Sequence, residues 1–458
     1  MLELDKVKKI YVIGIKGQGV TAMVQILASM GIEVTGSDTD EKFSTDEVLQ
    51  KLGIRYFEEF SPANIPTDAG MILYSTSYNA ENNIEFAEAR KGWIPMVSYP
   101  EMLAGLFNRK YGIAVCGTHG KTTTSSMLAY VLDMAGASPT AVIGSRIRQW
   151  GTNALVGKGD YFIIEADEYQ NKLALYEPKA AILTSVDYDH PDFFKTFGDY
   201  KKAFSDFVAK IPKIGFLAVW GDSVATNEIA CSCQGNIIKY GFMEDNDIII
   251  RNHSFSGTQQ KFEIFFLEES LGFFEIKLPG KHNVLNAAAV IAACHQLNAD
   301  LEKVREALRD FEGTSRRFEM IGGRNGAILI DDYAHHPEEI KATLKATREI
   351  YPDKNVIAVF HPHSFSRTEA LLEDFAQSFD DADKVIVLDI YGSARESSGA
   401  VSSADLVRLI NKYNRDKADH VPTIAEVVEF LQDKIGGDDV VITIGAGNVF
   451  EVAGKLKQ

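Results

Sequence analysis

Short apolar strands alternate with helical segments along almost the whole chain, and this alternation limits the folds open to it. In the first part of the sequence we predict strands and helices from their periodicity, with strands at 10–15, 32–36, 70–76 and 94–99 and helices at 20–30 and 85–92. A helix between two strands returns the chain to the same end of the sheet, so that successive strands run parallel. The sequence therefore predicts an α/β fold in which helices cover the faces of parallel sheets.

A second α/β unit begins with a strand at 111–116 and a helix at 121–135, and it continues through strands at 161–165 and 180–186. Its later part, 236–280, differs, because apolar and polar side chains alternate there in runs such as KFEIFFLEE. This alternation predicts an antiparallel β excursion from the parallel sheet.

A third α/β unit is predicted from strands at 327–332, 355–360, 384–390 and 439–445. The chain has 458 residues, enough for about three domains of roughly 150 residues each. We therefore expect three α/β domains, at 1–108, 109–316 and 317–458.

Composition and charge narrow the class of protein further. Hydrophobic residues make up 45% and charged residues 24% of the chain, as in soluble globular proteins. The net charge of −17 repels nucleic acid and anionic membranes, so we expect no partner of either kind. Four cysteines give no disulfide framework and no zinc spacing, and no segment approaches the roughly 20 apolar residues of a membrane span. These features predict a cytoplasmic protein.

The segment VCGTHGKTTTSS at 115–126 carries the most specific chemical signal. A strand ends at Cys116, a glycine-rich turn follows, and a helix begins at Lys121, so that backbone N–H groups converge where a polyphosphate can bind. Lys121 is expected to reach the outer phosphates and Thr122 to offer its hydroxyl to Mg²⁺. Val115 replaces the first glycine of the usual pattern, so the loop is a shortened variant. The alternative is an ordinary strand-to-helix turn.

An acidic residue ends the next strand of this unit, and an acidic residue and a histidine follow the one after it. Glu165 ends one strand, and Asp189 and His190 follow the other. The carboxyl ends of parallel strands share one edge of the sheet, where ligands collect. Mg²⁺ prefers oxygen ligands, so Glu165 and Thr122 make a plausible site, whereas His190 indicates a second, softer position that tolerates Mn²⁺.

A glycine turn, GIKGQG, follows the first strand, and Asp38 lies about 20 residues beyond it. The spacing departs from the G-x-G-x-x-G dinucleotide fingerprint, and the turn alone is a weak signal. It leaves an NAD-dependent oxidoreductase as one alternative. A nucleotide-switched protein without enzymatic activity is a second alternative.

Six motifs in this order resemble the Mur ligases of peptidoglycan synthesis: GTHGKTTT, EADE, the DH pair, KHNVLNA (281–287), RRFE (316–319) and DDYAHHP (331–337). The resemblance covers essentially the whole chain. It implies an N-terminal Rossmann-like domain that binds UDP, a central P-loop ATPase-like domain and a C-terminal Rossmann-like domain that binds the amino acid. It also implies an ATP-dependent ligase that forms an amide through an acyl phosphate.

Five segments are most similar to family members that join L-alanine to UDP-N-acetylmuramate: VIGIKGQGVTAM (12–23), TGSD (35–38), GTNA (151–154), HPHSFSRT (361–368) and DIYGSARE (389–396). Tyr169 is instead closer to members that attach a recycled murein tripeptide to the same UDP-sugar. The resemblance therefore implies ATP, UDP-N-acetylmuramate and L-alanine as partners, with the tripeptide as the alternative acceptor. It leaves both a monomer and a homodimer open.

The resemblance also implies roles for individual residues. Those expected to bind ATP are Gly117, Thr118, His119, Gly120, Lys121, Thr122, Thr123, Asn283, Asn286, Arg317 and Asp332. Those expected to bind the UDP-sugar are Gly14, Gly17, Gly19, Asp38, Ser75, Thr76 and Asn153. Tyr333, His335 and Arg367 would surround the amino acid, with Arg367 on its α-carboxylate. The metal ligands would be Thr122, Glu165 and His190, and the catalytic residues Lys121, Glu165, His190, His335 and Arg367.

Several positions depart from the family pattern, among them Lys16, Ala22 and Phe204. Lys16 stands where glycine is usual, and it either adds a diphosphate contact or points to solvent. Related ligases carry a carbamylated lysine after the DH pair, but the alignment puts Phe204 there, so we predict no carbamate.

Overall fold

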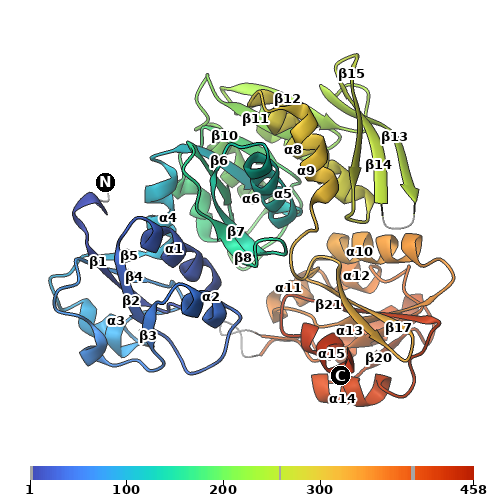
Figure 1. Ribbon diagram of the computed structural model, residues 1–458. Helices are drawn as coiled ribbons and strands as arrows, with labels where there is room; N and C mark the ends of the chain where they lie inside the picture. The colour runs from blue at the N-terminus through green and yellow to red at the C-terminus, as the bar shows by residue number, and fades with distance from the viewer. Residues whose placement is uncertain (1–3, 257–258, 393–397, 458) are drawn as a thin grey trace.

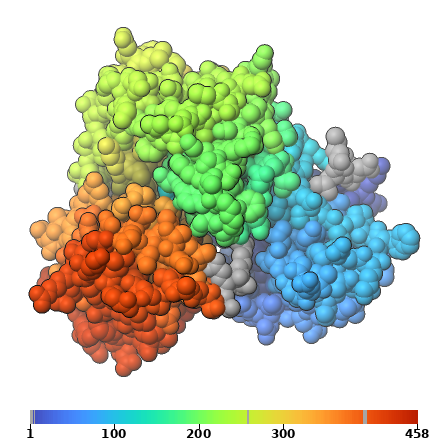
Figure 2. All heavy atoms as spheres, turned by 180° about the vertical axis from the view of Figure 1, so that it is seen from behind, coloured from blue at the N-terminus to red at the C-terminus, as the bar shows by residue number. Residues whose placement is uncertain are grey.

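The computed structural model describes residues 4–256, 259–392 and 398–457. The chain forms three α/β lobes, with the N-terminal and C-terminal lobes on either side below the central one (Figure 1, and from behind in Figure 2). Each lobe has its own sheet, which confirms the predicted fold class. Among the described helices, none is both long and apolar enough to cross a bilayer. Part of the 389–396 segment, from residue 393 on, lies outside the described residues.

The N-terminal sheet has the order β3-β2-β1-β4-β5, and all its strands are parallel. Its strands are β1 (Lys9–Ile13), β2 (Glu33–Ser37), β3 (Arg55–Phe57), β4 (Met71–Tyr74) and β5 (Met96–Ser98). Its helices are α1 (Gln18–Ser29), α2 (Thr45–Lys51), α3 (Ile84–Ala89) and α4 (Tyr99–Phe107). The four predicted strands are present, and the short β3 adds a fifth.

The central sheet has ten strands in the order β15-β14-β13-β12-β11-β10-β6-β9-β7-β8. The strands are β6 (Tyr111–Cys116), β7 (Thr140–Ile147), β8 (Thr152–Leu155), β9 (Tyr161–Glu165), β10 (Ala180–Leu183), β11 (Phe216–Trp220), β12 (Asn236–Gly241), β13 (Ile248–Ser256), β14 (Gln259–Phe266) and β15 (Glu269–Ile276). Strands β13, β14 and β15 pair antiparallel, which confirms the later part of the predicted excursion, whereas β12 at its start runs parallel to both β11 and β13. The helices are α5 (Lys121–Met134), α6 (Phe197–Val208), α7 (Val224–Ala230), α8 (Lys281–Gln296) and α9 (Leu301–Asp310).

The C-terminal sheet has the order β16-β17-β21-β18-β19-β20. Its strands are β16 (Glu319–Arg324), β17 (Ala327–Asp332), β18 (Asn355–Phe360), β19 (Lys384–Val387), β20 (Ala418–His420) and β21 (Asp439–Ile444). Its helices are α10 (Pro337–Ile350), α11 (Phe365–Ala370), α12 (Leu372–Ala376), α13 (Ser403–Tyr413), α14 (Ile424–Leu431) and α15 (Phe450–Lys457). Only β16 runs antiparallel, because a tight turn joins it directly to β17.

The N-terminal and central domains share one hydrophobic cluster, beside a further cluster in each of them. A single cluster of buried side chains runs from Ile10 of β1 through Phe107 of α4 to Leu217 of β11, whereas the C-terminal domain has separate clusters. The β7–β8 hairpin also contacts α1, where the Thr152 hydroxyl donates to Gln25 over 3.0 Å. The first two domains are therefore packed together as one body.

Lys16 does not point to solvent, so that alternative was wrong, and the diphosphate contact stays a prediction. Its side chain is fully buried, and Nζ donates to the backbone oxygens of Thr39 (2.8 Å) and Glu41 (3.0 Å). Nζ also lies 3.0 Å from Glu58 and 3.4 Å from Asp46. Lys16 thus fastens the segment after β2 to the glycine turn.

Candidate active site

The glycine-rich turn between β6 and α5 is shaped by two positions that favour glycine. Gly117 has φ of +131° and Gly120 has φ of +76°, both in the left-handed range. A Cβ on Gly117 would also lie 2.3 Å from the hydroxyl of Thr184. The turn therefore packs closely on the end of β10 and leaves the N-terminus of α5 as an anion-binding position.

Lys121, the first residue of α5, curls back over this turn. Its Nζ donates to the backbone oxygens of Gly117 (2.6 Å) and Thr118 (3.2 Å) and lies 3.1 Å from Glu168 Oε2. Burial alone would lower the pKa of Lys121, but the charge of Glu168 raises it above the usual value. The ammonium is therefore charged and positioned at the mouth of the turn.

Glu168 is a residue that sequence reasoning missed. Its side chain is 1% exposed and accepts a hydrogen bond of 2.8 Å from the buried Tyr200 hydroxyl. Tyr200 in turn lies 2.9 Å from the hydroxyl of Thr118. The available signal was the second glutamate of EADE, three residues after Glu165.

The predicted metal ligands fall into two groups. The Thr122 hydroxyl donates to Glu165 Oε1 over 2.8 Å, and Glu165 Oε2 accepts from the Gly144 N–H over 2.7 Å. His190 instead lies with Asp167 and Glu168, and one ligand atom of each lies within 4.8 Å of the others. These donor sets fit hard divalent cations, because carboxylate and hydroxyl oxygens dominate them.

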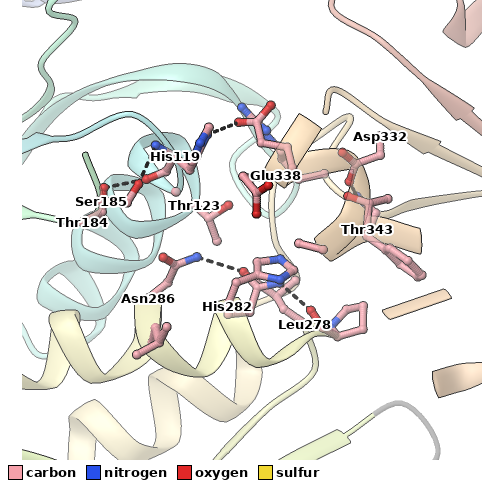
Figure 3. A pocket seen from close by; sticks show the side chains of 18 of the residues that line it. His119, Thr123, Thr184, Ser185, Leu278, His282, Asn286, Asp332, Glu338 and Thr343 are labelled. Carbon is pink, nitrogen blue, oxygen red and sulfur yellow. Dashed lines mark hydrogen bonds and ion pairs between the residues drawn. The ribbon is translucent and has the colours of Figure 1, made fainter. Parts of the chain in front are cut away.

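A cavity of about 340 Å³ opens beside the turn, between the central and C-terminal domains. Figure 3 shows His119, Thr184 and Ser185 on one side of it, His282 and Asn286 on α8, and Asp332, Glu338 and Thr343 from the C-terminal domain. The predicted ATP-binding residues Thr123, Asn283 and Arg317 also line it. Its size and its mixed lining suit a nucleoside.

Asn283 and Asn286, one helical turn apart on α8, are joined to each other. The Asn283 side chain donates to the backbone oxygen of Pro279 over 2.6 Å, and the Asn286 side chain donates to Asn283 Oδ1 over 3.0 Å. The aromatic residues Trp220 and Tyr240 line the same cavity and were missed by the sequence analysis. Trp220 ends β11, a strand that the periodicity did not reveal.

Asp332 and Arg317 bring the C-terminal domain to this cavity. Asp332 accepts from the backbone N–H groups of Phe318 and Ala334, each over 2.7 Å. Burial raises the pKa of Asp332 to about 6. Arg317 lies over the Tyr333 ring, 5.2 Å from its centroid. Both residues line this cavity.

A second cavity adjoins the first, and all three domains line it. Gln18 comes from the N-terminal domain, Lys121 and Glu165 from the central domain, and Tyr333 and His335 from the C-terminal domain. The rings of Tyr333 and His335 meet edge to face, 5.4 Å apart. The proposed phosphate, metal and amino-acid groups therefore face one space.

Two polar contacts join the central domain to the C-terminal domain across these cavities. His119 Nδ1 lies 3.2 Å from Glu339 Oε1, and Arg367 Nε donates to Asp189 Oδ1 over 3.0 Å. The sequence analysis expected Arg367 to face an α-carboxylate, and in the structure a carboxylate of the chain itself contacts it. Glu339 was missed, although it is the third residue of α10.

The predicted UDP-sugar residues gather at the carboxyl edge of the N-terminal sheet. Gly14 N–H donates to the Ser37 oxygen, and Ser75 N–H donates to the Ile13 oxygen, each over 2.9 Å. Asp38 accepts from Lys16 N–H over 2.7 Å. Asn153 reaches this edge from the β7–β8 hairpin and donates to the Gln18 oxygen over 3.2 Å. Of the remaining predicted residues, Gly17 and Thr76 lie in the same turns, and Gly19 is the second residue of α1.

The fold and the site define a three-domain α/β protein whose glycine-rich turn opens beside a cavity between two domains. Three domain families match in succession: "Mur ligase family, catalytic domain" at 9–111, "Mur ligase middle domain" at 115–294 and "Mur ligase, glutamate ligase domain" at 316–447. The chain belongs to the Mur ligase family, and the resemblance seen in its motifs is confirmed.

Curated relatives match over the full length of the chain. A UDP-N-acetylmuramate–L-alanine ligase of Desulfitobacterium hafniense is 41% identical over 98% of this chain and 99% of its own. The ligase of the same name from Caldanaerobacter subterraneus is 38% identical over 99% of this chain and 98% of its own.

Solved structures are also similar. The crystal structure of the UDP-N-acetylmuramate–alanine ligase of Thermotoga maritima has a TM-score of 0.83, with 26% identity over 98% of both chains. A murein peptide ligase from Psychrobacter arcticus has a TM-score of 0.74, with 22% identity over 98% of both chains, and this likeness shows the fold alone.

Proposed function

We propose that the chain is an ATP-dependent ligase that joins L-alanine to UDP-N-acetylmuramate in peptidoglycan precursor synthesis. The observation that carries the proposal is full-length similarity, at up to 41% identity, to ligases named for this reaction. Membership of the Mur ligase family replaces the two other hypotheses, an NAD-dependent oxidoreductase and a nucleotide-switched binding protein.

In the proposed reaction, the muramate carboxylate attacks the γ-phosphorus of ATP and ADP leaves, giving an acyl phosphate. The amine of L-alanine then attacks the acyl carbon, and the tetrahedral intermediate expels inorganic phosphate as the amide forms. The protein contributes positioning and charge neutralisation, through Lys121 on the transferring phosphoryl group and Arg317 from the C-terminal domain. The cavity between the domains limits access of water to the acyl phosphate.

The proposal includes Mg²⁺, with Mn²⁺ tolerated. Thr122 and Glu165 would hold one ion beside the phosphates, and His190 a second. When bound, such ions neutralise developing phosphoryl charge. The donor sets support this assignment, because hydroxyl and carboxylate oxygens lie beside the phosphate-binding turn. We also propose a cytoplasmic protein, a monomer or homodimer, with domains at 1–108, 109–316 and 317–458.

The alternative hypothesis, in which the acceptor is a recycled murein tripeptide, is based on Tyr169. The Tyr169 hydroxyl donates to Asp192 over 2.8 Å, and its ring lies 4.7 Å from the His190 ring. Both contacts stay inside the central domain, whereas the proposed amino-acid residues Tyr333, His335 and Arg367 belong to the C-terminal domain. These two contacts therefore give no support to a larger acceptor.

The test is coupled ADP release with UDP-N-acetylmuramate and each of L-alanine, glycine, L-serine and the recycled tripeptide. We expect L-alanine to be used best and glycine and L-serine measurably less, because one methyl or hydroxyl supplies only about 1–3 kcal/mol of discrimination. Activity with the tripeptide and none with L-alanine would replace the proposal with the recycling reaction.

A further inference from the structure

The pair formed by Arg367 and Asp189 is buried and crosses a domain boundary. Arg367 Nε donates to Asp189 Oδ1 over 3.0 Å, and Nη2 donates to Oδ2 over 3.3 Å. Arg367 is 7% exposed and Asp189 is 5% exposed. A bidentate pair of this kind fixes the plane and the direction of the guanidinium, which a single contact does not.

The contact with Asp189 uses only one of the two edges of the guanidinium. A guanidinium carries five N–H donors, so it can present two edges of paired donors. Asp189 occupies the edge made by Nε and Nη2. The other edge, made by Nη1 and the second hydrogen of Nη2, is not used by Asp189, and Nη1 lies 3.5 Å from His363 Nδ1.

Asp189 is itself held firmly. Its Oδ1 accepts from the His190 N–H over 2.7 Å, and the residue lines the cavity that Lys121, Glu165 and His335 share. Asp189 is therefore held by Arg367 on one side and by the backbone of His190 on the other, beside the proposed reaction space.

We propose that Asp189 is a positioning residue for the amino-acid substrate. It holds Arg367 by the Nε–Nη2 edge, so that the opposite edge is presented to the α-carboxylate of L-alanine. This inference rests on the proposed function. Because Asp189 belongs to the central domain and Arg367 to the C-terminal domain, the arginine is oriented only when the two domains are in contact.

The test compares Asp189→Asn with the full-length wild-type enzyme. Asparagine keeps the shape but loses the charge and one acceptor, so Arg367 becomes free to turn. Misplacing a substrate-binding group costs up to about 100-fold, and we expect the KM for L-alanine to rise by roughly 10- to 100-fold. The KM values for ATP and UDP-N-acetylmuramate should stay within about twofold of the wild-type values, because Arg367 is proposed to contact neither of these ligands.

A second readout separates positioning from general damage. L-Alaninamide has the amine but lacks the α-carboxylate, so wild-type enzyme should prefer L-alanine to it. Asp189→Asn should narrow this preference by about the factor by which the KM for L-alanine rises. Asp383→Asn is the matched control, because Asp383 also pairs with an arginine, Arg348, but lies away from the cavities. It should change neither quantity.

Each other outcome has a defined meaning. An unchanged KM for L-alanine in Asp189→Asn would overturn the inference, and so would a lower KM, which would make Asp189 a competitor of the substrate. If Asp189→Asn does not fold, Arg367→Lys tests the same edge of the guanidinium. Lysine keeps the positive charge but lacks the planar pair of N–H donors. It must then raise the KM for L-alanine and leave that for ATP unchanged. Wild-type enzyme that does not use L-alanine would contradict the proposed function instead.

Discussion

Lys121 and Glu168 form an ion pair in the phosphate-binding turn, with Nζ 3.1 Å from Oε2. The glutamate is buried and is also held by Tyr200, so the pair is fixed on both sides. Phosphate oxygens that reach this turn must share the ammonium with Glu168. The lysine is thus positioned before ATP arrives, which is the arrangement that electrostatic catalysis needs.

Replacing Lys121 by alanine should nearly abolish turnover. Without the ammonium, the transferring phosphoryl group loses a preorganised cation, and we expect phosphate release to fall by roughly 10²–10³-fold. Lys202→Ala is the control, because Lys202 is exposed and pairs only with Asp206 on the same helix. Phosphate release by Lys121→Ala within about threefold of wild type at saturating ATP would refute the assignment of the turn.

Glu165→Ala should raise the Mg²⁺ concentration needed for activity. The substitution removes an oxygen ligand, and changes around a metal site cost roughly 10- to 100-fold in metal affinity. His190→Ala should weaken support by Mn²⁺ more than support by Mg²⁺, because imidazole is the softer ligand. Titration of activity with each metal measures both effects. If neither titration shifts, neither residue is a ligand.

Lys16→Met should lower stability and weaken binding of the UDP-sugar. The free energy of unfolding should fall by about 2–3 kcal/mol, below the roughly 3–5 kcal/mol of a fully buried pair, because Glu58 is 40% exposed. The KM for UDP-N-acetylmuramate should rise, since Asp38 directly precedes the segment that Lys16 holds. Urea unfolding and kinetics test this against Lys42→Met, which removes an exposed lysine from the same glutamate. Equal effects of both substitutions would contradict the role of burial.

The contact between His119 and Glu339 should make domain closure depend on pH. Burial alone would lower the pKa of His119, but its hydrogen bond to Glu339 raises it above the usual 6.5. The protonated form is therefore favoured in the closed structure. Its contribution is complete below pH 6.5 and is lost as the pH rises through the higher value of the folded state.

Small-angle scattering across this range measures the effect. The radius of gyration of the wild type should increase as the pH rises above 6.5. The radius of gyration of His119→Gln should not show the same increase. A flat wild-type curve would show that this contact does not hold the domains together.

The sequence predicted the parts of the site that follow from local pattern. Thr122 and Glu165 meet because the phosphate loop and a neighbouring strand end at the same edge of a parallel sheet, as expected. Lys16 was misjudged, since its partners lie up to 42 residues away and no periodicity marks them.

The contacts between domains could not be predicted from the sequence for a different reason. His119 and Glu339 are 220 residues apart, and Arg367 and Asp189 are 178 apart. Their meeting depends on how two separately folded lobes are placed, which neither strand nor helix propensity encodes. The short strands β3 and β20 were missed because three residues show no period.

The hydrophobic core shared by the first two domains has a consequence for how the chain loses its structure on heating. Side chains of both domains belong to one buried cluster, whereas the C-terminal clusters are separate. Melting the N-terminal sheet would expose part of the apolar surface on which the central sheet depends, so the two should melt together in one cooperative transition. The C-terminal domain, whose hydrophobic clusters are separate, should give its own calorimetric peak. A nucleotide bound between the lobes would bring the temperatures of the two calorimetric peaks closer together.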